Sequence, residues 1–282
     1  MAVLTISREF GSGGRTVGRT VAGELQYEYV DRGIILDEMR KAGKQWEETA
    51  SYYDENYPDI TERYRWTYRG FVALNQLHIL EYALKDNVVI MGRGGNFLLR
   101  GIPYALRVRI KAPIEDRVKR VMQREGVNSE NALWLLEKAD SEMARAVYLI
   151  YGKQIDDLSQ YDMALDVGIQ TVEQISATLR EALLLRDRHK TPEAQAVLHL
   201  RVVAARIKAA IATDPSFSVS VIDVDPKEEG LPEYGLIVRA VIHDQADGKR
   251  IEELARTIAG NVPLDFQLPY RWIGRTGRQE FK

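Results

Sequence analysis

The chain has 282 residues and a formal net charge of −2, with 39 lysines and arginines against 41 aspartates and glutamates. A charge this close to zero provides no broad basic field, so we expect no nucleic-acid partner. The absence of cysteine excludes a disulfide framework and a thiolate metal site. No apolar run approaches the roughly 20 residues that span a bilayer, and the first residues do not form a charged and then apolar leader. We therefore expect a cytoplasmic protein with no transmembrane segment.

Strands and helices are expected to alternate along the first two thirds of the chain. The predicted strands cover residues 2–6, 27–30, 88–91, 105–110 and 163–167, and the predicted helices cover 15–26, 33–42, 69–85, 114–124, 129–150 and 171–186. Such alternation is typical of an α/β domain with a parallel sheet and helices on both faces. The aromatic-rich stretch 44–68 could stack on a base or form the core of a helical insert.

The pattern changes after residue 186. Residues 187–196 are polar and are predicted to form a linker between a domain at 1–186 and a smaller one at 197–282. In the smaller domain the periodicity predicts a helix, two strands, a second helix and a third strand, at 197–212, 217–221, 236–242, 248–259 and 263–268. The order α-β-β-α-β indicates a small α+β domain.

A glycine-rich turn, Glu9-Phe10-Gly11-Ser12-Gly13-Gly14-Arg15-Thr16, follows the first predicted strand and leads into a helix. Such a turn can direct several backbone N–H groups at one anion, and the helix adds the positive end of its dipole. In the usual phosphate loop, G-x-x-x-x-G-K-[ST], Glu9 would be glycine and Arg15 lysine. Arg15 can still pair with phosphate oxygens, and Thr16 offers a hydroxyl for Mg²⁺. A polyphosphate ligand is expected, with a plain structural turn as the alternative.

Ligands of parallel sheets bind beyond the carboxyl ends of the strands. Gly11–Gly14, Asp31 and Arg93 each follow directly after a predicted strand, so we expect them to gather at one edge of the sheet. Asp31 could hold a metal-bound water or a substrate hydroxyl, or it could cap the helix that starts near Gly33. Arg93 lies between glycines, from which its side chain could extend into an open cleft.

Arginines recur on the two helices predicted at 114–150. Arg117, Arg120 and Arg124 share one helix face, and Arg145 lies on the next helix. Two helices hinged near residues 125–128 would form a lid that brings these cations over bound phosphates and excludes water. Phosphoryl transfer requires cations of this kind around the moving group. A solvated pair of charged helices is the alternative.

Together these residues resemble the cytidylate kinase-like family of P-loop nucleoside monophosphate kinases, over about residues 1–185. The likeness rests on Ile6-Ser7-Arg8-Glu9-Phe10-Gly11-Ser12-Gly13-Gly14-Arg15 and on the order and spacing of the later motifs. It implies a P-loop kinase-type, five-stranded parallel sheet flanked by helices. It also implies ATP- and Mg²⁺-dependent phosphoryl transfer to a nucleoside monophosphate, CMP-like, or to a related small acceptor.

The resemblance implies a role for each matched position. The ATP phosphates would be wrapped by Gly11, Ser12, Gly13, Gly14, Arg15 and Thr16, with Arg15 on the transferring phosphate and Thr16 on Mg²⁺. The acceptor would be bound by Asp31, Arg32, Arg93 and Asp140. The lid would carry Arg117, Arg120, Arg124 and Arg145, and the catalytic groups would be Arg15, Arg120, Arg145 and Asp31.

Several positions depart from the family pattern. Gly94 replaces the aspartate of Gly-Arg-Asp, and Arg32 replaces the threonine of Asp-Thr-Gly. Asp37 and Met143 stand where relatives carry arginine. These departures leave a second interpretation open, in which the protein binds a nucleotide, transfers phosphate poorly and signals to a partner through its C-terminal domain.

Residues 197–282 resemble, less closely, a BON domain, a small α/β module linked with phospholipid or partner binding. The likeness rests on the order of the elements and on the segment Arg250-Ile-Glu-Glu-Leu-Ala-Arg256. It implies a protein or lipid partner for this region. A dimerisation or regulatory module of similar shape is the alternative.

Overall fold

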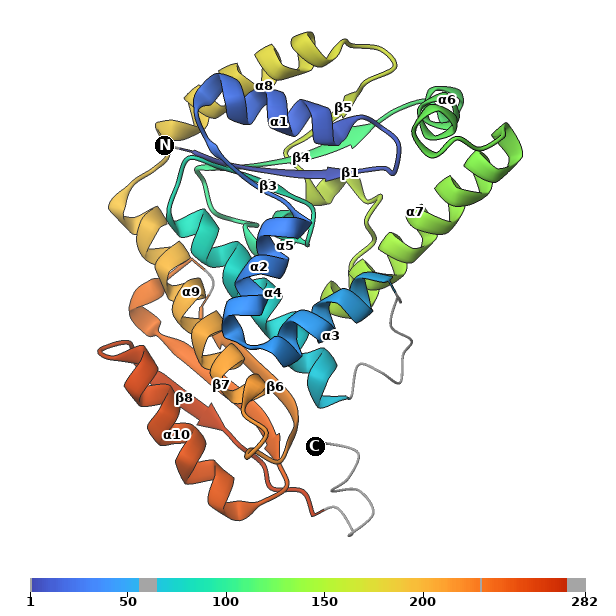
Figure 1. The fold of residues 1–282 in the computed structure, drawn as a ribbon. Coiled ribbons are helices and arrows are strands. Elements are labelled where there is room, and N and C mark those ends of the chain that lie inside the picture. The colour runs from blue at the N-terminus through green and yellow to red at the C-terminus, as the bar shows by residue number, and fades with distance from the viewer. Residues whose placement is uncertain (1, 56–64, 229, 273–282) are drawn as a thin grey trace. The chain divides into compact units, whose positions relative to one another are not determined.

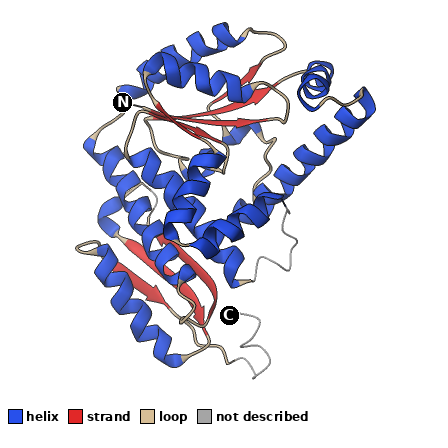
Figure 2. Cartoon of the chain, viewed as in Figure 1, coloured by secondary structure: helices blue, strands red, loops and turns tan. Residues whose placement is uncertain are grey.

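The computed structural model describes residues 2–55, 65–228 and 230–272. The chain divides into two compact units. The parallel-sheet unit comprises residues 1–34 and 85–191, and the mixed-sheet unit comprises 35–84 and 192–282. The units therefore differ from the segments expected from the sequence, because residues 35–84 pack with the C-terminal elements. Figure 2 distinguishes the helices and strands of the two units.

The parallel-sheet unit contains five strands in the order β2-β3-β1-β4-β5 (Figure 1). Their bounds are Val3–Arg8 (β1), Glu28–Val30 (β2), Val88–Met91 (β3), Ala105–Lys111 (β4) and Met163–Asp166 (β5). Every pairing is parallel, with Ile6 opposite Met91 and Val30 opposite Ile90. The carboxyl ends of β1, β2 and β3 therefore lie at one edge, as expected. The predicted α/β class and five-stranded parallel sheet are confirmed.

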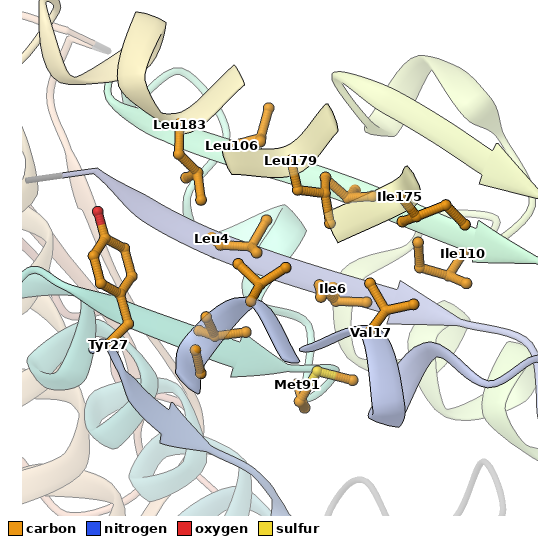
Figure 3. Close-up of a cluster of buried hydrophobic side chains, with 14 of the residues drawn as sticks. Leu4, Ile6, Val17, Tyr27, Met91, Leu106, Ile110, Ile175, Leu179 and Leu183 are labelled. Atoms are coloured by element: carbon orange, nitrogen blue, oxygen red, sulfur yellow. The ribbon is translucent and has the colours of Figure 1, made fainter. Parts of the chain in front are cut away.

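One face of this sheet is covered by α1 (Gly14–Leu25) and α8 (Val172–Asp187). Strand alternation directs Leu4 and Ile6 to this face, where they meet Val17 and Leu179 in a fully buried cluster (Figure 3). Burying one such side chain contributes about 1.5–3 kcal/mol. This core holds the start of α1 next to the end of β1, which determines where the intervening glycine loop lies. The short helix α5 (Gly95–Leu98) follows β3.

Two helices, α6 (Ile114–Glu125) and α7 (Ser129–Tyr151), form a hairpin after β4, as the sequence predicted. Gly126 ends α6 in the left-handed region, with φ 68°. The side chain of Asn128 caps α7 by accepting a hydrogen bond from the backbone N–H of Asn131. Val121, Ala132 and Leu136 form a buried cluster that holds the two helices together.

The mixed-sheet unit contains three strands in the order β6-β7-β8, with β6 and β7 antiparallel and β7 and β8 parallel. Its elements are α3 (Lys44–Glu55), α4 (Trp66–Leu84), α9 (Pro192–Thr213), β6 (Val219–Pro226), β7 (Leu236–Ile242), α10 (Gln245–Ala259) and β8 (Leu264–Gln267). Helix α2 (Arg32–Ala42) leads into this unit from β2. The order from α9 to β8 is the α-β-β-α-β order that the sequence predicted.

The aromatic residues of the insert form part of its core. The rings of Trp46 and Trp66 lie 5.2 Å apart, and those of Tyr53 and Tyr68 lie 5.0 Å apart, both edge to face. Trp46, Tyr53 and Tyr68 are buried. This arrangement matches the helical-insert alternative for these residues. The tyrosines at 57 and 64 lie outside the described residues.

The connection between α8 and α9 is shorter than the linker expected at 187–196. Helix α8 ends at Asp187 and α9 begins at Pro192, so only residues 188–191 connect them. Proline is favoured at the first position of a helix because its fixed φ is suited to the helix and its missing N–H is not needed there. The polar composition of 192–196 belongs to the first turns of α9. No helix in the described part of the chain is long and apolar enough to cross a membrane.

Candidate active site

The glycine loop, residues 9–13, connects β1 to α1 at the carboxyl edge of the parallel sheet. Gly11 and Gly13 adopt left-handed conformations with φ 76° and 87°. The turn is closed by the N–H of Ser12, which donates to the carbonyl of Glu9 over 3.2 Å. Within the described residues, the backbone N–H groups of Gly11, Gly13 and Arg15 donate to no protein acceptor. These donors, with the start of α1, can bind an anion.

Helices α6 and α7 contact this loop closely. A Cβ atom at Gly11 would lie 3.1 Å from Cδ2 of Leu136 and 3.2 Å from Cγ2 of Val121. Gly11 therefore satisfies two requirements, a left-handed backbone and close contact with the α6–α7 cluster. A side chain at this position would push the lid helices away from the loop.

Two of the expected lid arginines bind the backbone of the loop. Nε of Arg117 donates to the carbonyl of Phe10 over 2.8 Å. Nη1 of Arg120 donates to the carbonyls of Ser12, over 3.1 Å, and Gly11, over 3.3 Å. The structure thus brings Arg117 and Arg120 to the loop although more than 100 residues separate them from it.

Arg117 is only 6% exposed and is paired with carboxylates. Its Nη2 donates to Asp140, and its Nη1 lies 3.6 Å from Oε2 of Glu9. Asp140 also accepts a hydrogen bond from the N–H of Phe10 over 3.0 Å, and Glu9 accepts one from the N–H of Ala112 over 3.1 Å. Asp140 therefore joins α7 to the loop, while Glu9, which replaces the first glycine of the usual motif, joins the loop to the end of β4. The sequence analysis did not find this role of Glu9.

The other two lid arginines are more exposed. The guanidinium of Arg124 lies 4.7 Å from the ring centre of Phe10 and pairs with Glu125. Arg145 is exposed on α7 and makes no ion pair within the described residues. The contacts therefore connect Arg117, Arg120 and Arg124 to the loop, but not Arg145.

Asp31 follows β2 and precedes α2. Its Oδ1 accepts a hydrogen bond from the N–H of Gly33 over 3.0 Å. Asp31 therefore caps α2, which is one of the two roles that the sequence left open for it. Its Oδ2 lies 3.8 Å from Nη2 of Arg19. Arg32 is the exposed first residue of α2. Asp37, one turn further on, accepts a hydrogen bond from Nη1 of Arg40 over 3.0 Å.

Arg93 follows β3 in an unusual backbone conformation. Its φ of 55° is left-handed, and its neighbours Gly92 and Gly94 have φ 69° and 78°. A left-handed arginine costs on the order of 1 kcal/mol or more, and such strain is concentrated at functional sites. The hydroxyl of Tyr151, the last residue of α7, donates to the carbonyl of Arg93 over 3.2 Å.

The same tyrosine explains why residue 94 is glycine. The ring of Tyr151 stacks on Phe97 with centres 4.9 Å apart, and a Cβ atom at Gly94 would collide with it. An aspartate at this position would overlap the Tyr151 ring. The departure from Gly-Arg-Asp is therefore matched by an aromatic side chain from the lid.

The donor set fits a nucleotide with Mg²⁺. Thr16 is exposed at the start of α1, where its hydroxyl is accessible to a ligand. The described residues contain no cluster of three or more histidines, aspartates and glutamates that could hold a metal alone. Mg²⁺ that is bound mainly by phosphate oxygens and water needs only one or two protein ligands, and the exposed Thr16 fits that requirement.

The parallel-sheet order, the glycine loop between the first strand and its helix, and the arginine-bearing hairpin define the class of the protein as a P-loop kinase. Comparison with known proteins agrees. The model of the cytidylate kinase-like family matches residues 3–169, and the chain belongs to this family.

Similar proteins cover the same part of the chain. A cytidylate kinase of Pyrococcus abyssi (strain GE5 / Orsay) is 29% identical over 181 residues, which are 64% of this chain and 93% of that protein. A cytidylate kinase of Pyrobaculum aerophilum is 32% identical over 170 residues, 60% of this chain and 85% of that protein. The crystal structure of an uncharacterized protein from Eubacterium ventriosum ATCC 27560 has the same fold, with a TM-score of 0.51 and 21% identity over 65% of this chain and 98% of that chain. The family match ends before residues 197–282, whose BON-like character stays a prediction.

Proposed function

We propose that the protein transfers the terminal phosphoryl group of ATP, with Mg²⁺, to a nucleoside monophosphate such as CMP or to a related small acceptor. The observation that carries this proposal is the contact of Arg117 and Arg120 with the backbone of the glycine loop. Two arginines thus lie beside backbone donors that have no acceptor among the described residues, at the same sheet edge as Arg93. The names of the similar proteins support CMP as the first acceptor to test.

On the donor side, the N–H groups of Gly11, Gly13 and Arg15 would bind the phosphate chain. The side chain of Arg15 is exposed at the start of α1 and would pair with the transferring phosphate. The chemistry that Mg²⁺ would supply here, when bound, is neutralisation of the charge that develops on the phosphate oxygens. The Thr16 hydroxyl would orient the metal.

The lid would stabilise the transition state. In phosphoryl transfer the protein acts mainly by positioning the reactants and by placing cations around the moving group. Nη1 of Arg120 would lie 3.9 Å from a Cβ atom at Gly13, so this guanidinium is beside the loop donors. Arg145, on the same lid, would reach the phosphates when the lid closes. Closure would also exclude water and so limit hydrolysis.

The acceptor would lie at the carboxyl ends of β2 and β3. Arg93 would pair with it, and Asp31, Arg32 and Asp140 would position it, as the family resemblance implies. The Tyr151 ring lies where the aspartate of Gly-Arg-Asp would extend, so we expect this protein to select its base by contacts that differ from those of its relatives.

A coupled ADP-release assay over CMP, UMP, AMP and GMP, each as ribose and deoxyribose forms, tests the proposal. We expect turnover with at least one acceptor, and a loss in Arg15→Ala of about 10²–10³-fold in kcat/KM, the usual effect of removing one such electrostatic contact. Arg180→Gln, at an exposed ion pair on α8, is the control. Folded wild-type protein that turns over none of these acceptors would rule out the proposed activity.

A second candidate is a catalytically weak nucleotide-binding protein whose C-terminal domain contacts a protein or lipid partner. It is favoured by the packing of α4 along α9 in one compact unit, because the insert that follows Asp31 and Arg32 is thereby joined to the C-terminal elements. Calorimetry showing tight binding of ATP and a monophosphate without turnover would support it. Flotation of the full chain with vesicles tests a BON-like lipid contact, and protein that stays in solution would contradict that version.

A further inference from the structure

Arg8, the last residue of β1, lies between two segments of the site. Strand alternation places it on the same face as Leu4 and Ile6, directed toward α1. A Cβ atom at Gly14 would lie 2.8 Å from Cβ of Arg8, and one at Gly92 would lie 2.6 Å from its Nη1. Glycines at the start of α1 and at the end of β3 therefore both leave room for this one side chain. Its guanidinium extends from the phosphate loop toward the turn that carries Arg93.

The charge of Arg8 is not paired with a carboxylate of the described residues. Among the described residues it has no ion pair and no side-chain hydrogen bond. Burial lowers its pKa, and the nearby cations Arg15, Arg93 and Arg109 lower it further. Arg109 differs, because it donates to Asp156 over 2.7 Å and to Ser7 over 2.9 Å. A cation held among like charges is costly unless an anion binds there.

A second donor lies near Arg8. The hydroxyl of Tyr29, on β2, is buried and has no hydrogen-bond partner in the described part of the chain. Burial and the carboxylate of Asp31 raise its pKa, so the phenol stays protonated and can donate. Arg8 and Arg15 are close enough to this phenol to affect its pKa in the opposite direction. Arg8 and the Tyr29 hydroxyl thus offer positive charge and a donor, and neither has a hydrogen-bond acceptor among the described residues.

We propose that Arg8 and Tyr29, beside Arg93, bind the phosphate of the monophosphate acceptor. This inference rests on the proposed function, and it adds Arg8 and Tyr29 to the residues that hold the acceptor. Guanidinium pairs with phosphate through two parallel hydrogen bonds, and a phenol adds a neutral donor. A dianion suits several converging cations better than a monoanionic carboxylate or an uncharged nucleoside does.

Binding to the full-length protein tests this site separately from turnover. Calorimetry would compare inorganic phosphate, CMP, cytidine and ATP in wild type, Arg8→Gln, Arg8→Lys, Tyr29→Phe and the control Arg180→Gln. We expect Arg8→Gln to weaken the binding of phosphate and of CMP about 10–100-fold, which is the usual effect of losing a charge-assisted pair. ATP binding should change less than about 3-fold, because the loop donors remain. Tyr29→Phe should weaken the binding of phosphate and of CMP about 3–10-fold. The affinities of Arg8→Lys should lie between those of Arg8→Gln and wild type.

A thermal-shift experiment measures ligand binding without any turnover of the ligand. Phosphate should raise the melting temperature of wild type and of Arg180→Gln, and it should not raise that of Arg8→Gln. If Arg8→Gln does not fold, Arg8→Lys and Tyr29→Phe decide the question. Equal losses of affinity for ATP and CMP in Arg8→Gln would overturn the proposal, and so would unchanged phosphate binding in that variant. A wild type that binds no phosphate monoester would overturn it as well. A protein that binds CMP through Arg8 but shows no turnover would contradict the proposed activity and leave this site supported.

Discussion

Tyr151 donates its phenolic hydroxyl to the backbone carbonyl of Arg93 over 3.2 Å. This bond joins the last residue of α7 to the strained turn after β3. Because the ring also stacks on Phe97 and covers Gly94, the lid and this turn are held together by one side chain. If α6 and α7 act as the proposed lid, its movement would be coupled to the position of Arg93.

Restoring the aspartate of the family pattern, Gly94→Asp, should destabilise the protein by about 2–4 kcal/mol. The new side chain would combine strain at φ 78° with overlap of the Tyr151 ring. The double variant Gly94→Asp/Tyr151→Ala removes the ring that the aspartate would overlap. Only the backbone strain caused by Gly94→Asp should then remain. Urea unfolding of the two single variants and the double variant measures the coupling. Effects that simply add would contradict the overlap.

Gly11→Ala should weaken ATP binding about 10-fold or more. The methyl group would meet Leu136 and Val121 and would move the lid helices from the loop, in addition to strain at φ 76°. Gly126→Ala is the matched control, because its φ of 68° is similar but nothing lies within 4 Å of the added atom. Calorimetric titration with ATP measures both. Equal affinity losses in the two variants would show that the contact with the lid is unimportant.

Arg69→Met should stabilise the protein by about 1–4 kcal/mol. All three guanidinium nitrogens of Arg69 are buried without a partner among the described residues, and burial lowers its pKa to about 10. Replacing a buried charged group with a well-packed apolar one of similar size is often stabilising. Arg206→Met in the same unit, which loses an exposed 2.8 Å ion pair with Glu81, should cost less than about 1 kcal/mol. Chemical denaturation measures both, and a clear destabilisation by Arg69→Met would assign that cation a structural or binding role.

Alkaline pH should destabilise the protein partly through Tyr27. Burial, with Asp187 and Asp86, raises the pKa of this phenol to about 12, against about 10 in the unfolded chain. Its stabilising contribution is therefore complete below pH 10 and is lost as the pH rises toward 12, with a total of at most about 3 kcal/mol. Tyr27→Phe should reduce the slope of unfolding free energy against pH in this range. A residual slope is expected from Tyr104, whose pKa burial also raises.

The exposed phenol of Tyr148 provides the control for this experiment. Tyr148→Phe should leave the slope between pH 10 and 12 unchanged. If Tyr27→Phe and wild type lose stability in parallel over that range, Tyr27 is not responsible for the alkaline effect.

Local patterns in the sequence predicted much of the fold. The apolar run before the glycine loop, its repetition at residues 88–91 and 105–110, and the intervening helical periodicity predicted the parallel sheet. Because parallel strands align their carboxyl ends, the same pattern predicted that the loop, Asp31 and Arg93 share an edge. The start predicted for α9 was wrong by five residues, because the polar composition of 192–196 is typical both of a linker and of an exposed first turn of a helix.

By itself, therefore, the sequence determined the order of strands and helices, the glycine loop and the edge of the sheet at which the site lies. These features depend on side-chain periodicity and turn chemistry, which act over a few residues. The tertiary structure alone decided that Asp140 binds the N–H of Phe10, 130 positions away, that Tyr151 occupies the space beside Gly94, and that Arg8 lies among cations. Such contacts depend on how helices and strands distant in sequence pack together, and no local pattern encodes that packing.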